Sequence, residues 1–531
     1  MNAQGLAGQR QHRSAKTLNR RAQGQEPHQQ ASARGASQAN RKIPRHADAR
    51  RVAYEALLRI DEQHSFSNLL VPKLCAHAQL STADSALVTD IVYGVLRWRG
   101  LIRPIIAAAA HRALDDIDDM IVPILELGTY QALWMEIAPH AVGASTVVLA
   151  KSLYGKGRAG FVNAVMHQII AKPLQTWQSM IVSRIDSHNQ FERLAVRYSH
   201  PKWIVEALYQ AWKHAGYDEE GDAMAVVSSM LEEDNQPAMV TLARHGQAIS
   251  QEDLQAQLPR RAVVQEGLLS PYALRVSGVN PAQIPAIQHK LVGVEDEGSQ
   301  CAALALAHAS VEGQASDYEQ QSLASMPISA RAHWLDMCAG PGGKTALIAS
   351  LAAERNIVVS ANEPSAHRAN LVRSNIEGLP SEAVDTVYEH DGRYFGKHMR
   401  EQFTRVLVDA PCSGLGALRR RPEARWRKRP EDIDDLTQLQ AQLLRSGIDA
   451  TMSGGVIAYV TCSPVVEETV QIVDDVLADP QYAQRVERLD TTEVLRRVCK
   501  PMPLPNRPGD VTLFEHLHHS DQMFISLLRK R

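Results

Sequence analysis

From residue 333 onward the sequence alternates between short apolar runs and helical patterns, and this alternation constrains the fold more than any other feature. Helical segments, among them 344–353 and the amphipathic 435–450, separate the apolar runs, which cover 333–337, 357–360, 386–388, 405–408 and 456–460. Strands that alternate with helices form a parallel sheet with crossover helices on its faces. The pattern therefore predicts a Rossmann-like α/β domain, whose ligands bind beyond the carboxyl ends of the strands.

The sequence before this domain divides into three parts. Residues 1–45 contain nine Lys or Arg, one acid and almost no large apolar residues, so we expect a disordered basic tail. Residues 46–175 carry apolar residues at three- and four-residue spacing and predict an all-α bundle. Residues 187–292 mix a helical pattern with strand patterns at 238–242, 262–265 and 273–276, which predicts a small α/β domain. The α/β domain at the end would then span 293–531, with the polar segment 311–329 as a loop insertion.

The bulk properties exclude several classes of protein. No run approaches the roughly 18 apolar residues of a membrane span, and the tail lacks the apolar region of a secretory signal. Six cysteines without regular spacing do not form a disulfide framework, so we expect free thiols in a reducing cytoplasm. No Cys/His cluster has metal-ligand spacing; we expect no metal, and we expect His516, His518 and His519 on the surface. Nothing suggests a heptad interface, which favours a monomer.

A glycine-rich turn, Leu335-Asp-Met-Cys-Ala-Gly-Pro-Gly-Gly-Lys-Thr345, follows the first of the predicted strands. A phosphate-binding loop is a near miss, because that motif needs glycine where Cys338 stands. S-adenosylmethionine fits better: Glu363, at the end of the second strand, suits its ribose, and Asp391 after the third suits its adenine. The predicted cofactor-binding residues are Cys338, Ala339, Gly340, Pro341, Gly342, Gly343, Lys344, Glu363, Asp391 and Asp409.

Two cysteines, Cys412 and Cys462, each follow an apolar strand. A thiolate that adds to C6 of a cytosine makes C5 nucleophilic enough to accept a methyl group, and a nearby cation such as Lys344 would lower the pKa of that thiol. Asp409 is placed to hydrogen-bond the Watson–Crick edge of the base. These arguments leave open which of the two cysteines attacks. The remaining cysteines are expected to be core residues or incidental thiols, with a structural role favoured for Cys338: Cys75, Cys301, Cys338 and Cys499.

The catalytic motifs resemble those of the Nop/Sun family of RNA cytosine-C5 methyltransferases. The matching segments are the glycine-rich turn, Asp391-Gly-Arg393, Asp409-Ala-Pro-Cys-Ser-Gly-Leu-Gly416, Arg419-Arg-Arg-Pro-Glu-Ala-Arg-Trp426 and Thr461-Cys-Ser463. The helical region, with Val92-Tyr-Gly-Val-Leu-Arg-Trp98 and Gly160-Phe-Val-Asn-Ala-Val165, resembles the NusB-type RNA-binding domain. The resemblance implies methylation of a specific cytidine in 16S (small-subunit) rRNA. It assigns Cys462 as the nucleophile and Cys412 to product release, with Asp409 and Lys344 near the base.

The implied partner is 16S rRNA or an immature small ribosomal subunit. Its target cytidine must be unpaired or flipped out of a duplex. A basic cluster directly follows Cys412, and we expect it to contact RNA: Arg419, Arg420, Arg421, Arg425, Arg427, Lys428 and Arg429. Two segments depart from the family pattern, Leu242-Ala-Arg-His245 and Asp521-Gln-Met-Phe524. The alternatives are a non-catalytic RNA-binding assembly factor and a P-loop NTPase.

Overall fold

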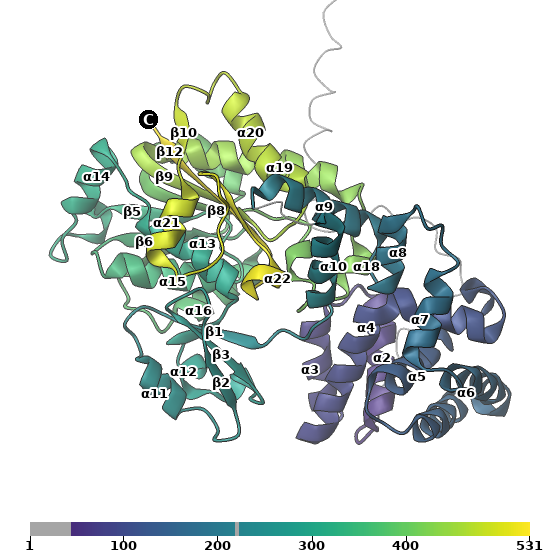
Figure 1. Ribbon diagram of the computed structural model, residues 1–531. Coiled ribbons are helices and arrows are strands. Elements are labelled where there is room, and N and C mark those ends of the chain that lie inside the picture. The colour runs from purple at the N-terminus through teal and green to yellow at the C-terminus, as the bar shows by residue number, and fades with distance from the viewer. Residues whose placement is uncertain (1–43, 218–221) are drawn as a thin grey trace, which may run out of the picture.

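The structure, a computed structural model, describes residues 44–217 and 222–531, so all but the last two positions of the predicted tail lie outside the described residues. A helical lobe, a small lobe with a four-stranded sheet and a large lobe with an eight-stranded sheet make up the molecule (Figure 1). This architecture confirms the predicted fold class. Within the two described ranges, no helix is both long and apolar enough to cross a membrane.

The helical lobe is built from amphipathic helices around one apolar core. It contains α2 (Ala49–Glu62), α3 (Ser67–His77), α4 (Thr82–Ala110), α5 (Val122–Trp134), α6 (Pro139–Ile170) and α7 (Leu174–Val182). Asp48 caps α2 by accepting hydrogen bonds from the N–H groups of Arg50 and Arg51. Apolar side chains three and four positions apart, such as Ala53, Ala56 and Leu57, are fully buried, as the spacing predicts.

Three further helices join the helical lobe to the large lobe. They are α8 (Gln190–Arg197), α9 (Lys202–Ala215) and α10 (Ala223–Glu233). Their apolar faces form one core with Leu415, Leu418 and Phe514 of the large lobe. These three helices therefore pack on the large lobe through an apolar contact.

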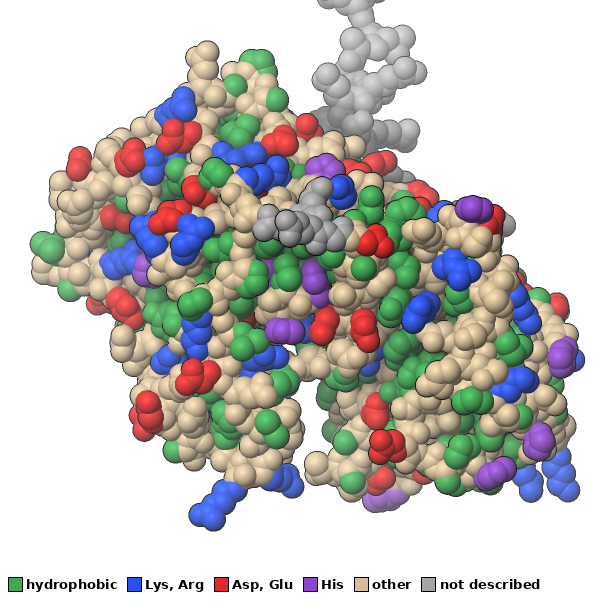
Figure 2. Space-filling model, viewed as in Figure 1, with side chains coloured by type: hydrophobic (Ala, Val, Ile, Leu, Met, Phe, Trp, Pro, Cys, Tyr) green, Lys and Arg blue, Asp and Glu red, His purple; other side chains and the backbone are tan. Residues whose placement is uncertain are grey.

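The small lobe carries an antiparallel sheet in the order β2-β3-β1-β4. Its strands are β1 (Val240–Arg244), β2 (Val263–Glu266), β3 (Ala273–Ser277) and β4 (Val292–Val294), with α11 (Gln251–Ala256) and α12 (Pro285–Gln288) beside them. The three predicted strands are confirmed, while β4 had no strand prediction. Figure 2 shows a hollow between this lobe and the helical lobe.

The large lobe contains a mixed sheet in the order β10-β12-β9-β8-β5-β6-β7, with β11 paired to β12. Its parallel part comprises β5 (His333–Asp336), β6 (Val358–Asn362), β7 (Val384–Tyr388), β8 (Phe403–Asp409) and β9 (Thr451–Thr461), which confirms the five predicted strands. The antiparallel strands are β10 (Val486–Arg488), β11 (Val511–Leu513) and β12 (Met523–Lys530).

Helices cover both faces of this sheet. One face packs against α13 (Glu297–His308), α15 (Gly343–Ala353) and α21 (Thr491–Val498). The other packs against α17 (Phe395–His398), α19 (Asp432–Ala450) and α20 (Val470–Ala478). Since helices bury both faces, the central strands carry continuous apolar runs, and Val456 to Val460 are all fully buried.

Two sequence-based expectations are wrong. The segment 311–329 is not only a loop, because it contains α14 (Gly313–Gln320). Glu319 of that helix accepts hydrogen bonds from Trp334, Thr404 and Arg405, so one carboxylate attaches a polar segment to the central strands β5 and β8. His518, expected on the surface, is buried at the end of α22 (Glu515–His518). Its Nδ1 accepts from the Phe514 N–H, and its Nε2 lies 2.9 Å from the Pro503 carbonyl oxygen.

Candidate active site

The predicted site residues gather at one edge of the large sheet. Because β5, β6, β7, β8 and β9 are parallel, their carboxyl ends meet there. The glycine turn follows β5, Glu363 follows β6 and Asp391 lies three residues beyond β7. Asp409 ends β8, and Cys412 and Cys462 lie just beyond β8 and β9.

The glycine turn needs glycine at two positions, one because of a close contact and the other because of its backbone angle. A Cβ atom on Gly340 would overlap the carboxylate of Glu363, and Gly342 at the start of α15 has φ +113°. Glu363 is 3 % exposed, and Arg368 donates to the Gly340 carbonyl while lying 3.3 Å from the Glu363 carboxylate. The turn, the N-terminus of α15 and this buried acid form a cradle. A ligand that combines a ribose hydroxyl pair with a charged amino-acid group, as S-adenosylmethionine does, fits this set of donors and acceptors.

Asp391 lies farther out on the same edge. Its side chain is 49 % exposed and pairs with Arg393 at 2.5 Å, and the hydrogen bond from Arg393 lowers the pKa of Asp391. Asn362, which the sequence did not single out, ties the ends of three strands together. Its amide donates to the carbonyl oxygens of Met337 and His390 and accepts from the His390 N–H.

Lys344 is a buried cation at the centre of the site. Its Nζ donates to Asp409 at 2.9 Å and to the hydroxyl of Ser299 at 3.0 Å. Burial alone would lower the pKa of Lys344, but Asp409 and Glu295 outweigh burial and raise it, so the side chain stays charged. Burial raises the pKa of Glu295 to about 7, and Lys344 opposes that rise. Glu295 and Ser299 lie in Val294-Glu-Asp-Glu-Gly-Ser-Gln300, which also resembles the family, but the sequence analysis assigned them no role in the site because they precede the strand pattern.

The two thiols are in contact. The sulfur atoms of Cys412 and Cys462 lie 3.5 Å apart. The hydrogen bond from Cys412 lowers the pKa of Cys462; burial opposes this shift and Lys344 adds to it. The same hydrogen bond, together with burial, raises the pKa of Cys412. The sequence left the roles open on physical grounds; with Cys412 as the donor of the shared hydrogen bond, Cys462 is the thiol that ionises more readily.

A buried carboxylate joins the two cysteine loops. Glu468 accepts from the hydroxyl groups of Ser413 and Ser463, which directly follow the two cysteines. It also accepts from the Ser413 N–H and the Gln440 amide. The sequence analysis missed this residue, although the repeated Cys-Ser pair was a signal that both loops need the same partner. Glu468 therefore fixes the two thiols relative to each other.

The basic cluster after Cys412 is used mainly inside the protein. Arg425 is 0 % exposed and donates to the carbonyl oxygens of Arg97 and Ser199 and to Asn235. Arg427 donates to carbonyl oxygens of the loop that ends α2, and Trp426 donates to the Leu96 carbonyl. The expected RNA contact is wrong for Arg425, because its guanidinium is sealed between lobes. These side chains hold the helical lobe on the catalytic one.

Comparison with known proteins places these features in context. Residues 325–529 match the family described as 16S rRNA methyltransferase RsmB/F, and residues 47–171 match the NusB family. A Mycobacterium tuberculosis protein named "Putative methyltransferase Rv1407" is 38 % identical over 483 residues, which cover 91 % of this chain and 96 % of that protein. The ribosomal RNA small subunit methyltransferase B of Escherichia fergusonii is 30 % identical over 421 residues, covering 79 % and 87 %.

The fold also has a match among solved structures. The crystal structure of PH0851 covers 92 % of this chain and 100 % of its own, with a TM-score of 0.69 and 19 % identity. At that identity the likeness concerns the arrangement of helices and strands alone.

Proposed function

Because the chain belongs to the RsmB/F family of rRNA methyltransferases, we propose that it methylates C5 of a cytidine in 16S rRNA through a covalent adduct with Cys462. S-adenosylmethionine, when bound in the cradle, supplies the electrophilic methyl group that the activated C5 accepts. The glycine turn, Glu363 and Asp391 hold this cofactor in the proposal. The helical lobe contributes rRNA binding.

Cys462 activates the base. Its thiolate adds to C6, forming a carbon–sulfur bond, and the electrons of the 5,6 double bond shift into the ring so that C5 becomes nucleophilic. Asp409, held by Lys344, faces the Watson–Crick edge of the base and hydrogen-bonds its activated form. After C5 has gained its methyl group, loss of the C5 proton restores the 5,6 double bond and expels the Cys462 thiolate. Cys412 assists this release.

One observation carries the proposal: two thiols lie 3.5 Å apart at neighbouring strand ends, beside the buried cation Lys344. A scaffold or a purely RNA-binding protein has no need of a thiol pair whose members have opposite pKa shifts. A methyltransferase that forms and then breaks a carbon–sulfur bond needs one nucleophile and one group for release, and this pair supplies both.

The first test uses labelled S-adenosylmethionine and deproteinised small-subunit rRNA. We expect the wild-type protein to produce 5-methylcytidine, Cys462→Ala to produce none, and Cys412→Ala to accumulate a protein–RNA adduct that resists denaturation. Cys75→Ala, which removes a buried thiol of the helical lobe, is the matched control and should behave as wild type.

Two results would change the assignment. If Cys412→Ala loses all transfer and Cys462→Ala traps the adduct, the roles of the two thiols are reversed. If the wild-type protein transfers no methyl group to rRNA yet binds it, the alternative of a non-catalytic assembly factor replaces the proposal.

A further inference from the structure

Arg420 differs from the arginines that join the lobes. It lies eight positions after Cys412, beyond the short helix η6 (Leu415–Ala417), and its side chain is 39 % exposed. Its Nη2 group forms an ion pair with Asp521, whereas Arg425 donates to four acceptors in the contact between lobes. Arg420 thus combines a fixed anchor on one side with access to solvent on the other.

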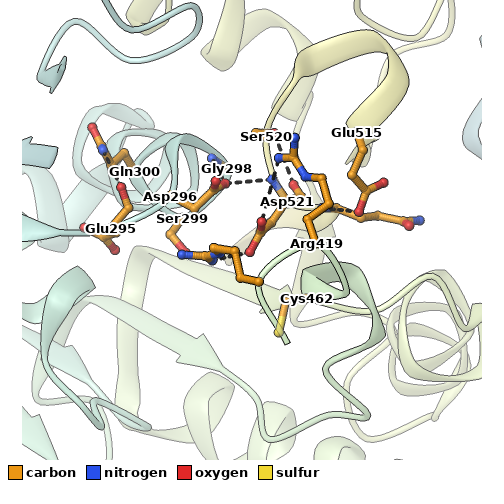
Figure 3. Close-up of polar contacts among 12 residues, drawn as sticks. Glu295, Asp296, Gly298, Ser299, Gln300, Arg419, Cys462, Glu515, Ser520 and Asp521 are labelled. Atoms are coloured by element: carbon orange, nitrogen blue, oxygen red, sulfur yellow. Dashed lines mark hydrogen bonds and ion pairs between the residues drawn. The ribbon is translucent and has the colours of Figure 1, made fainter. Parts of the chain in front are cut away.

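The anchor of Arg420 is itself rigid. Asp521 is 1 % exposed, and its backbone N–H donates at 2.8 Å to Asp296, which caps α13. Arg419 approaches the same carboxylate from within the protein at 3.9 Å. Figure 3 shows Asp521 between Asp296 and Arg419, with Cys462 beneath them.

Backbone hydrogen bonds connect the segment around Asp521 to Cys462, the proposed nucleophile. The Gly416 N–H donates to the Cys462 carbonyl, and the Gln522 N–H donates to the Gly416 carbonyl. A Cβ atom on Gly416 would overlap the Gln522 carbonyl oxygen, so the three segments meet too closely for any other residue. Arg420, its anchor and Cys462 are therefore held in one fixed arrangement.

Arg420 is a permanent positive charge within electrostatic reach of the nucleophile. Burial would lower the pKa of Arg420, but Asp521 and Asp296 outweigh burial, and Cys462 adds to the rise. A guanidinium has five N–H donors. With one terminal group paired to Asp521, other terminal N–H groups stay available to a ligand that reaches Cys462.

The chemistry of the substrate indicates which group of the ligand these N–H donors of Arg420 would contact. A base whose C6 contacts Cys462 carries its glycosidic N1 on the adjacent ring position, so the ribose and its phosphate must lie beside the sulfur. We propose that Arg420 binds a backbone phosphate of the target nucleotide and so sets the base over Cys462. This inference rests on the proposed function, because it takes the nucleotide bound at Cys462 to be part of an RNA chain.

The test measures binding of deproteinised small-subunit rRNA against salt concentration, without methyl donor. Each phosphate that a protein neutralises contributes about 0.7 to 0.9 to the slope of log affinity against log salt. We expect Arg420→Met to lower the slope by about that amount and to weaken binding about tenfold at low salt. Arg420→Lys should keep the slope. Arg496→Met, which removes an exposed arginine paired with Glu493 on α21, is the matched control and should leave the slope unchanged.

The double variant Arg420→Met/Asp521→Asn guards against misfolding, because it removes both charges of the Arg420–Asp521 ion pair together. It should show the same loss of slope as Arg420→Met, with the Cys462 alkylation rate of the wild type. An unchanged slope in both variants would overturn the inference. A lowered slope together with absence of 5-methylcytidine formation by the wild-type protein would leave this phosphate contact standing while the proposed function fails.

Discussion

At the scale of single residues, the contact between Cys412 and Cys462 couples the two sulfurs. The two thiols share a hydrogen bond, and with Cys412 as its donor this bond is the largest cause of the lowered pKa of Cys462. The positive charge of Lys344 also lowers the pKa of Cys462. The reactivity of Cys462, the proposed nucleophile, should therefore depend on Cys412, which is not proposed to attack.

We predict that Cys412→Ala raises the pKa of Cys462, because the thiolate loses its hydrogen-bond donor. The rate of Cys462 alkylation by iodoacetamide, followed by mass spectrometry as a function of pH, should rise at a higher pH than in the wild type. Cys412→Ser keeps a donor and should shift the profile less. Identical profiles for the three proteins would show that the hydrogen bond does not set the reactivity of Cys462.

The sequence predicted which residues meet at the site better than it predicted how they are used. Strand ends converge in any parallel sheet, so Glu363, Asp409 and both cysteines could be placed together from the strand pattern alone. Glu468 and Ser299 could not, since a buried carboxylate or hydroxyl acquires its partners only when distant segments pack. The difference in pKa between the cysteines likewise depends on a distance that no sequence pattern contains.

At the scale of elements, the short helix α18 (Ala424–Arg427) connects the helical lobe to the large lobe. From charge alone, a run of arginines next to Cys412, a proposed catalytic residue, predicts a contact with nucleic acid. The structure instead turns Arg425 toward the backbone carbonyl groups of Arg97, within α4, and of Ser199, between α8 and α9. The charge pattern of the sequence could not reveal this role of Arg425, because its acceptors are mainly main-chain carbonyl oxygens, which every residue has.

We predict that Arg425→Met destabilises the contact between lobes. The change leaves the carbonyl oxygens of Arg97, Ser199 and Asp234 and the side chain of Asn235 without their buried donor. The free energy of unfolding in urea should fall by about 3 kcal/mol. Arg429→Met, at an exposed position of the same run, should change it by less than about 0.5 kcal/mol. Equal effects of the two changes would contradict the role given to Arg425.

At the scale of the whole molecule, the fold class could be predicted from the periodicity of apolar residues, but the strands β10 to β12 and the strand β4 could not. The antiparallel strands β10, β11 and β12 extend the parallel sheet, and β12 delivers Asp521 and Gln522 to the cysteine loops. The strand β4 likewise carries the chain from the small lobe to Glu295 and Asp296. The strands β4, β10 and β11 are each three residues long, too short for the apolar pattern that marked the other strands, and β12 runs antiparallel to β9 instead of continuing the parallel alternation.

We predict that deleting residues 1–45 weakens rRNA binding without abolishing methyl transfer. The segment carries nine Lys or Arg and one acid, so it adds non-specific attraction to phosphates, whereas every proposed catalytic residue lies beyond it. The dissociation constant for rRNA should rise at low salt, and the difference should shrink as salt is added. Turnover at saturating rRNA should match that of the full chain; a folded but inactive truncated protein would contradict this.

The hydrogen bonds that Arg425, Trp426 and Arg427 make to the helical lobe have a consequence for target choice. They leave little freedom for the helical lobe to move relative to Cys462. In the proposed function, once the helical lobe binds one feature of the rRNA, only a cytidine at a set distance from that feature can reach Cys462. The protein would then work as a molecular ruler, selecting its cytidine by distance and orientation rather than by neighbouring bases.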